Sequence, residues 1–301
     1  MVERKLHLDT VAVVGLIGCC LLWGLNQIAM KALLAEVPAL QQAALRSLGA
    51  ALLVWLWARW RGIRLFERDG TVPGGLLAGA LFAAEFACIF IGLQYTSASR
   101  MVVFLYIAPF VVALGMSFIS RAERLSVAQL TGLSLAFAGV AWAFAEGFTR
   151  PAIGDMQWVG DTLGVAAGVL WGATTLSIRG TRLTAASAEK TLLYQLAVSG
   201  VLLAAAVAAS GVPLPARLSW FAWGTLAFQT VIVAFASFLL WFWLIARYPA
   251  TRLSSFTLLT PVFGLLFGAL LLAEPITARL VVALAAVAGG IVMVNRAPAR
   301  R

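Results

Sequence analysis

The sequence predicts an all-α integral membrane protein with ten transmembrane helices, arranged as two inverted five-helix repeats. Three observations support this prediction: the composition, the number of long apolar runs, and the recurrence of short motifs at one spacing. Apolar residues make up 62% of the 301 residues and charged residues only 11%, and the mean hydropathy is +0.96. Water-soluble domains are about 45–50% apolar and about 25% charged. A chain of this composition needs lipid as part of its solvent.

Ten apolar runs are long enough to cross a bilayer, which takes about 20 helical residues. Most prolines near their ends lie in short connections, where a proline costs no helical hydrogen bond. Because the connections are short, we expect consecutive helices to run antiparallel in a compact bundle. The runs cover residues 11–30, 39–59, 72–94, 98–119, 126–146, 158–178, 187–209, 219–246, 250–272 and 277–294.

The net charge of +10 orients these helices. The basic residues are scattered in short clusters between apolar runs, whereas a nucleic-acid-binding protein gathers them into one patch. With the N-terminus placed in the cytoplasm, sixteen of the 22 basic residues fall on the cytoplasmic side, five on the outer side, and Arg46 within a helix. The positive-inside rule then predicts a multi-pass membrane protein with both termini in the cytoplasm.

Few residues are suited to catalysis or metal binding. Cys19, Cys20 and Cys88 all lie inside apolar runs, and His7, the single histidine, precedes the first run. These residues form neither a metal-ligand spacing nor a nucleophile–base pair. The sequence therefore predicts no enzyme, no metal site and no cofactor. The first run has the position of a signal peptide, but its motif recurs later in the chain, so we expect it to be retained.

The chain repeats itself at a spacing of about 150 residues. Leu22-Trp23-Gly24 recurs as Leu170-Trp171-Gly172 at an offset of 148. Residues around the fourth run recur around the ninth at an offset of 152, and two further pairs recur at 151. These pairs are Ala98/Ala250, Arg100/Arg252, Phe104/Phe256, Pro109/Pro261, Glu123/Glu274 and Gly139/Gly290. The repeat predicts two domains, residues 1–150 and 151–301.

Each predicted half has five helices, so the second half must enter the membrane from the opposite face. Inverted repeats of this kind are typical of secondary transporters, whose substrate site lies near the midplane between the repeats. Two similar halves can exchange conformations, which exposes such a site to one side of the membrane and then to the other. We therefore expect a carrier of a small solute rather than a membrane-embedded enzyme or a purely structural protein.

Several short motifs carry a family resemblance. They are the pairs Trp23-Gly24 and Trp171-Gly172, Ala44-Leu45-Arg46, Pro109 and Pro261, and the stretches Glu123-Arg124-Leu125-Ser126 and Glu274-Pro275-Ile276-Thr277. With these motifs the chain resembles the drug/metabolite transporter superfamily, in its ten-helix EamA branch, over essentially its whole length. Within that branch it is most similar to the YddG-type exporters of aromatic and other amino acids. The resemblance implies a central cavity lined by helices one, three, four, six, eight and nine, buttressed by helices five and ten, and export to the periplasm.

Glu85 is the only acidic residue well inside a run, near the middle of the third. An ionised carboxylate at that depth costs about 2.5–3.5 kcal/mol even on permissive insertion scales. It should therefore face the bundle interior, where it would bind a substrate ammonium or carry a coupling proton. A protonated or structurally paired carboxyl is the alternative. At an offset of 152 it corresponds to Ser237, which is also polar and within a run.

Arg46 lies eight residues after Pro38, which places it about 12 Å below the outer membrane edge at 1.5 Å per residue. It could attract a substrate carboxylate, or it could pair with Glu85 or with helix-end carbonyls and hold the outer half together. The resemblance places an arginine here in transporters of many substrates, which gives the structural role equal weight.

Two faces combine a deep tryptophan with polar residues. Asn26 and Gln27 follow Trp23 by three and four residues, and so lie on one helical face. Trp171 and Thr174, together with Thr175, form the matching face of the sixth helix. These faces predict cavity walls, to which we add Trp241 in the eighth helix. Interhelical packing with satisfied hydrogen bonds is the alternative.

Pro109 and Pro261 lie mid-helix at symmetric positions. A proline there frees a carbonyl and kinks the helix, so both are hinge candidates. Tyr106 and Ser254 lie within two turns of them and could reach into the cavity. By contrast, the glycines at every fourth position from 160 to 172 predict close helix packing rather than a site.

These observations predict a secondary transporter that exports amino acids, aromatic and other neutral ones, across the inner membrane by alternating access. Glu85 would face the substrate ammonium and Arg46 the carboxylate, while Trp23, Trp171 and Tyr106 would surround the side chain. Two alternatives stay open: a multidrug or lipophilic cation exporter, and an importer of another small metabolite. The expected partners are the small-molecule substrate and the bilayer, without nucleic acid. The oligomeric state stays open, and a monomer is compatible with the sequence.

Overall fold

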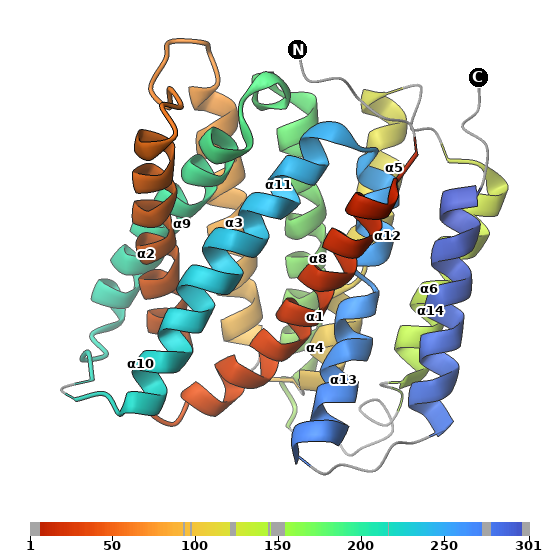
Figure 1. The fold of residues 1–301 in the computed structure, drawn as a ribbon. Coiled ribbons are helices and arrows are strands. Elements are labelled where there is room, and N and C mark those ends of the chain that lie inside the picture. The colour runs from red at the N-terminus through yellow and green to blue at the C-terminus, as the bar shows by residue number, and fades with distance from the viewer. Residues whose placement is uncertain are drawn as a thin grey trace.

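The computed structural model describes residues 7–92, 94–96, 98–120, 125–143, 145, 154–215, 217–272 and 278–296, and these form helices joined by short connections (Figure 1). The helices line up as ten rods. The first five rods are α1 (Thr10–Leu33), α2 (Ala39–Trp60), α3 (Val72–Gly92), α4 (Ala98–Leu105) followed by α5 (Ala108–Ile119), and α6 (Val127–Ala143). The second five are α8 (Gln157–Gly180), α9 (Ala188–Ser210), α10 (Trp220–Ala227) continued by η3 (Phe228–Ser237) and α11 (Phe238–Arg247), α12 (Ala250–Phe256) followed by α13 (Leu259–Leu272), and α14 (Ala278–Arg296). A short 3-10 turn, η2 (Arg182–Ala185), lies between α8 and α9.

The predicted all-helical membrane fold with ten helices is confirmed, but three of the ten rods differ from the single uniform helix that the apolar runs suggested. The fourth and ninth rods are each interrupted, between α4 and α5 and between α12 and α13. The eighth rod contains η3, a π-helical stretch of ten residues. Such stretches are rare and frequently lie at functional sites.

Five helical spans of the described residues are both long and apolar enough to cross a membrane. They are Thr10–Met30, Val72–Gly92, Arg100–Ile119, Ala188–Ser210 and Trp220–Arg247. The helices α2 and α8 have the length but are less apolar, because each carries several buried polar side chains. These are Gln41, Gln42, Arg46 and Ser47 in α2, and Thr174, Thr175, Ser177 and Arg179 in α8. These eight side chains are therefore buried inside the bundle.

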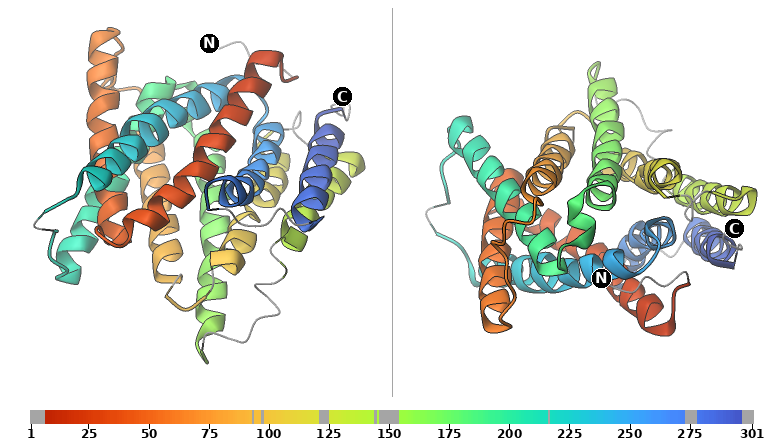
Figure 2. Two further views of the ribbon diagram at one scale, coloured as in Figure 1. Left: turned by 60° about the horizontal axis from the view of Figure 1, so that its bottom comes forward. Right: turned by 90° about the horizontal axis from the view of Figure 1, so that it is seen from above.

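The contacts between rods are paired across the two halves. The first rod packs on the ninth, and its repeat equivalent, the sixth rod, packs on the fourth. The third rod packs on the sixth, and the equivalent eighth rod packs on the first. The second rod packs on the seventh, and α6 packs on α14 at one edge of the bundle (Figures 1 and 2). The predicted boundary at residues 150 and 151 lies outside the described residues, as do Glu123 and Arg124 of the first motif stretch and the whole stretch from Glu274 to Thr277.

The two predicted hinge prolines lie directly after the two interruptions. Pro109 is the second residue of α5 and Pro261 the third residue of α13. Each lacks an N–H, so the carbonyl four residues earlier, on Leu105 or Thr257, loses its helical donor. A shorter bond closes one of these gaps, where the Thr260 N–H donates to Thr257 O at 2.9 Å. The breaks thus agree with the proline positions, and a hinge motion stays a prediction.

The glycines of the two Trp-Gly pairs lie against the backbone that follows each break. A Cβ at Gly24 would lie 3.0 Å from the carbonyl oxygen of Thr260, and one at Gly172 would lie 3.2 Å from that of Ala108. Ala108 and Thr260 are related by the same offset of 152 as the two prolines. Glycine is therefore needed at both positions for the rods to approach this closely.

Candidate functional site

Trp23, Ser237 and Trp241, three of the predicted site residues, lie together where α1 meets the end of η3. The Trp23 indole Nε1 donates to Ser237 Oγ at 2.9 Å, and Ser237 Oγ donates to the Val233 carbonyl at 2.6 Å. The Trp23 ring packs edge-on against Trp241 and Phe238, with centroids 5.4 and 6.0 Å apart. Every polar group of the Trp23–Ser237 pair therefore has a partner.

Glu85 is buried in α3 with an unsatisfied oxygen. Its residue is 6% exposed, and Oε2 receives no hydrogen bond. A charge on this carboxyl is attracted by Arg46. Tyr106 is also buried and packs edge-on against Trp171, with ring centroids 5.5 Å apart. The structure thus brings the predicted residues Tyr106 and Trp171 into contact.

Arg46 is buried in α2, 3% exposed, without a carboxylate partner. Its guanidinium carbon lies 4.4 Å from the centroid of the Phe86 ring, and its Nη1 lies 3.9 Å from the Met30 sulfur. Its Nη2 has no hydrogen-bond partner. Glu85 attracts the Arg46 guanidinium electrostatically, but the two described side chains form no direct ion pair. Both charged groups therefore keep one atom available in the buried interior.

Two glutamines near Arg46 were not among the predicted site residues. Gln42 lies one turn before Arg46 and donates to Val37 O at 2.8 Å, while its Oε1 accepts from Gln229 Nε2 at 3.2 Å. Gln229 lies in the first turn of η3, is fully buried, and has an unpartnered Oε1. The spacing of Gln42 from Arg46 was a signal in the sequence, whereas the contact with Gln229 depends on the packing of α2 against η3.

Four predicted site residues remain, Asn26, Thr174, Ser254 and Gln27, and the first two form hydrogen bonds within their own helices. Asn26 Nδ2 donates to the Met30 sulfur at 3.2 Å, and its Oδ1 has no partner. The Thr174 hydroxyl donates to Leu170 O of its own helix at 2.9 Å, a common local bond. Ser254 is buried in α12. The side chain of Gln27 lies outside the described residues.

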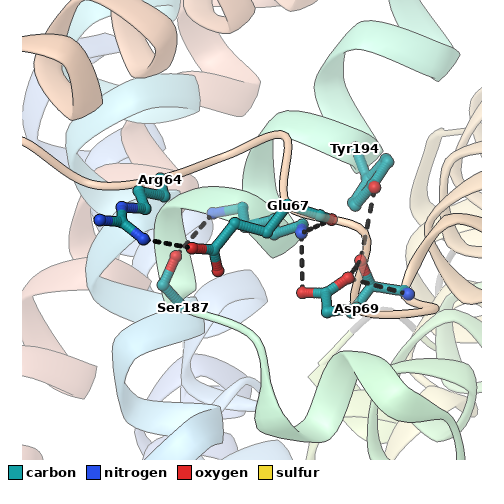
Figure 3. A network of polar contacts seen from close by, with 7 residues as sticks. Arg64, Glu67, Asp69, Ser187 and Tyr194 are labelled. Atoms are coloured by element: carbon teal, nitrogen blue, oxygen red, sulfur yellow. Dashed lines mark hydrogen bonds and ion pairs between the residues drawn. The ribbon is translucent and has the colours of Figure 1, made fainter.

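Polar contacts tie the halves together at the proximal end of the bundle, which we define as the end where α1 begins and α2 and α14 end (Figure 3). Lys190 Nζ lies 2.7 Å from Asp69 Oδ2 and donates to the Glu67 carbonyl at 3.1 Å. The Thr71 hydroxyl donates to Asp69 Oδ1 at 2.6 Å. Hydrogen bonds from Lys190 and Thr71 hold the pKa of the Asp69 carboxyl well below its usual range. This network ties the loop between α2 and α3 to α9.

A carboxylate also joins the halves at the opposite, distal end. The hydroxyl and the backbone N–H of Ser219, which caps α10, donate to the two carboxylate oxygens of Glu36 at 2.7 and 2.9 Å. These bonds lower the pKa of the Glu36 carboxyl. In the part of the chain that the structure describes, no three acidic, cysteine or histidine side chains gather as a metal site would require.

Two of the known proteins with similar sequences are named as uncharacterized transporters, and a third is named as an uncharacterized protein. The uncharacterized transporter YvbV of Bacillus subtilis is 29% identical over 280 residues, covering 91% of this chain and 88% of its own. The uncharacterized transporter sll0355 of Synechocystis is 28% identical over 307 residues, covering 92% and 87%. The uncharacterized protein PA1977 of Pseudomonas aeruginosa is 28% identical over 301 residues, covering 97% and 94%.

The fold and the family agree with these relatives. A solved crystal structure superimposes with a TM-score of 0.81 at 17% identity, covering 95% of this chain and 96% of its own, so the two share a fold. The sequence also matches the family model described as the EamA-like transporter family twice, over residues 10–145 and 158–296. With ten rods, matching halves and a match in each half, this chain belongs to the EamA-like transporter family.

Proposed function

We propose that this transporter exports neutral amino acids, aromatic ones among them, across the bacterial inner membrane by alternating access. The observation that carries this proposal is the pair of buried opposite charges, Glu85 and Arg46. Each keeps one atom without a partner, Oε2 and Nη2 respectively, and the two attract one another without direct contact. An amino acid zwitterion offers an ammonium to the first and a carboxylate to the second.

The energetics of burial favour a ligand between these groups. An isolated charge inside a membrane protein is costly and normally faces a partner or a water-filled cavity. A buried ion pair compensates its desolvation only when its geometry is good. Glu85 and Arg46 have no such geometry with one another, so a substrate that pairs with both would satisfy them together.

Aromatic rings supply the apolar part of the proposed site. Tyr106 of the first half packs edge-on against Trp171 of the second, and Trp23 of the first half packs edge-on against Trp241 of the second. Aromatic side chains of a substrate are attracted to such ring edges and faces by about 0.5–1.5 kcal/mol beyond simple burial. This lining supports the YddG-type preference for aromatic amino acids that the sequence suggested.

Export of lipophilic cations is a second candidate, favoured by the aromatic rings beside Glu85. Phe82, Phe86 and Phe90 form a ladder along α3, with neighbouring centroids 4.7 and 5.9 Å apart. Phe86 already holds a cation, the Arg46 guanidinium, at 4.4 Å. Cation–π attraction of this kind is worth about 2 kcal/mol or more when desolvated.

Transport by purified protein in liposomes separates the two candidates. Vesicles would be tested against a panel of radiolabelled amino acids and against a fluorescent quaternary ammonium dye. We expect counterflow of several neutral amino acids, with the aromatic ones among the fastest. Transport of the dye without counterflow of any amino acid would overturn the proposal in favour of cation export.

We also propose that the proximal end of the bundle faces the cytoplasm, as the distribution of basic residues predicts. A fluorescent protein fused after Arg301 should then fold and fluoresce in intact cells, and alkaline phosphatase fused there should be inactive. An active phosphatase fusion would reverse the orientation, and with it the proposed direction of export.

A further inference from the structure

Three side chains, here named the distal latch, join the two halves at the distal end. Arg100 Nε donates to Asp161 Oδ1 at 3.0 Å, and its Nη2 donates to Oδ2 at 2.5 Å. The Thr96 hydroxyl donates to the same Oδ1 at 2.6 Å. Arg100 lies in α4 and Thr96 lies two residues before α4, whereas Asp161 lies in the second turn of α8. A two-pronged arginine–carboxylate pair is a strong and directional contact, so it holds the fourth rod on α8.

A second group, here named the proximal latch, joins the halves at the other end. The Tyr248 hydroxyl donates to Asp9 Oδ2 at 2.8 Å. Arg252 lies in the first turn of α12, and its Nη1 lies 2.8 Å from Nδ1 of His7, two residues before Asp9. Asp9 also caps α1, because its Oδ1 accepts from the Ala12 N–H at 3.0 Å. These contacts hold the ninth rod on α1.

The two latches are related by the internal repeat. Adding 152 to positions 96, 100 and 9 gives positions 248, 252 and 161, so hydroxyl, arginine and aspartate correspond one to one. The Trp-Gly pairs are related by an offset of 148, so Asp9 lies four residues, about one turn, farther from its tryptophan than Asp161 does. At the proximal latch the hydroxyl is on a tyrosine, which reaches farther than the threonine of the distal latch and spans that extra turn.

Each latch holds a short helix that ends at a proline break. The helix α4 has eight residues and α12 has seven, and Pro109 and Pro261 follow them. A helix that is fixed at one end by a latch and interrupted at the other can move as a unit when the latch opens. Each end of the bundle therefore has the same arrangement. At the distal end the first half supplies the short helix and the second half the aspartate, and at the proximal end these roles are reversed.

We propose that the distal and proximal latches are the two gates of the transport cycle, and that release of either aspartate opens its own end alone. This inference rests on the alternating access proposed above. A carrier must not open at both ends at once, and two gates built from opposite helix pairs allow one to open while the other holds.

Thiol labelling beneath each latch tests the proposal without any substrate. Met101 lies one residue after Arg100 and is 3% exposed, and Leu253, its counterpart at offset 152, is 0% exposed. Met101→Cys and Leu253→Cys would be introduced separately into a background with Cys19, Cys20 and Cys88 replaced by alanine. In nanodiscs, where both faces are accessible, the reaction rate with a membrane-impermeant maleimide would be measured.

We expect Asp161→Asn to raise the labelling rate of Met101→Cys at least about fivefold, within the usual range of coupling between sites, and to leave that of Leu253→Cys unchanged. Asp9→Asn should do the reverse, since asparagine still caps α1. Asp69→Asn removes a proximal carboxylate outside both latches and should change neither rate. A faster rate at both positions in each variant, or at neither, would overturn the proposal. A failure of amino acid transport in liposomes would leave this result standing, so the two proposals fail separately.

Discussion

The packing of α1 on the eighth rod and the packing of α8 on α3 are equivalent in the repeat, yet their central side chains differ. On α1, Trp23 donates to Ser237, and the pair is satisfied. On α3, the position equivalent to Ser237 is Glu85, which has an unpartnered oxygen, while Trp171 packs on Tyr106 instead. The repeat has therefore kept the glycine and proline positions that set the backbone, while the polar groups at the centre of these two contacts have diverged. The unsatisfied charges lie in the first half.

Replacing the two equivalent polar groups, Glu85 and Ser237, should affect transport very unequally. We expect Glu85→Gln to lower the initial rate of amino acid counterflow at least about tenfold, because a hydrogen bond to a charged group contributes about 1.5–3 kcal/mol. Ser237→Ala should lower that rate by no more than about twofold, since its hydroxyl is already used by Trp23.

Glu67→Gln is the matched control, because this carboxylate is exposed and pairs with exposed Arg64. Counterflow in this variant should equal that of the unmodified protein. If Glu85→Gln also transports at the full rate, the carboxylate has a structural role and the proposed ammonium site is wrong.

The glycines of the two Trp-Gly pairs occupy equivalent positions in the two halves, so replacing either should have a similar effect on stability. Gly24→Ala and Gly172→Ala each place a methyl group closer to the opposing helix than an ordinary van der Waals contact. Overpacking of this kind costs about 1–3 kcal/mol, so we expect both variants to lower the melting temperature in detergent by a similar amount.

Gly18→Ala provides the control within α1, because a Cβ there meets nothing within 4 Å. Alanine is the better helix former, so this variant should be neutral or slightly more stable. A large loss for Gly24→Ala with none for Gly172→Ala would show that the two close approaches are not equivalent.

Local patterns in the sequence predicted the parts of the fold that depend on local rules. The apolar runs gave the number of rods, and Pro109 and Pro261 marked the two breaks because a proline removes a backbone donor wherever it stands. Features that depend on packing between distant segments were missed. Gln229 gave no local signal for its contact with Gln42, and η3 looked like any other apolar run. The guanidinium of Arg46 lies on the ring of Phe86 rather than in an ion pair with Glu85, and its role toward a substrate carboxylate stays a prediction.

The contact between Gln42 and Gln229 has no equivalent on α3, and a double-mutant cycle would measure what it contributes. Gln42→Leu removes the acceptor of Gln229 Nε2, so a buried amide loses its partner at a cost of about 1–3 kcal/mol. Gln229→Leu should cost less, because Gln42 keeps its bond to Val37. We expect the double variant to be more stable than the sum of the two losses implies, as judged by thermal unfolding. Strict additivity would show that the two amides do not interact.

The Asp69–Lys190 contact at the proximal end should give the smallest effect and a defined dependence on pH. The folded-state pKa of Asp69 lies below its ordinary value of about 3.9, so its stabilising contribution is complete above that value and is lost as the pH falls through the folded-state pKa. Asp69→Asn should therefore lower the melting temperature slightly at pH 7, and the difference from the unmodified protein should shrink below about pH 4. Lys190 is buried and loses its opposite charge in this variant, which fixes the sign of the effect at neutral pH. A difference that is the same at pH 7 and at pH 3.5 would show that the charge of Asp69 does not stabilise this end of the bundle.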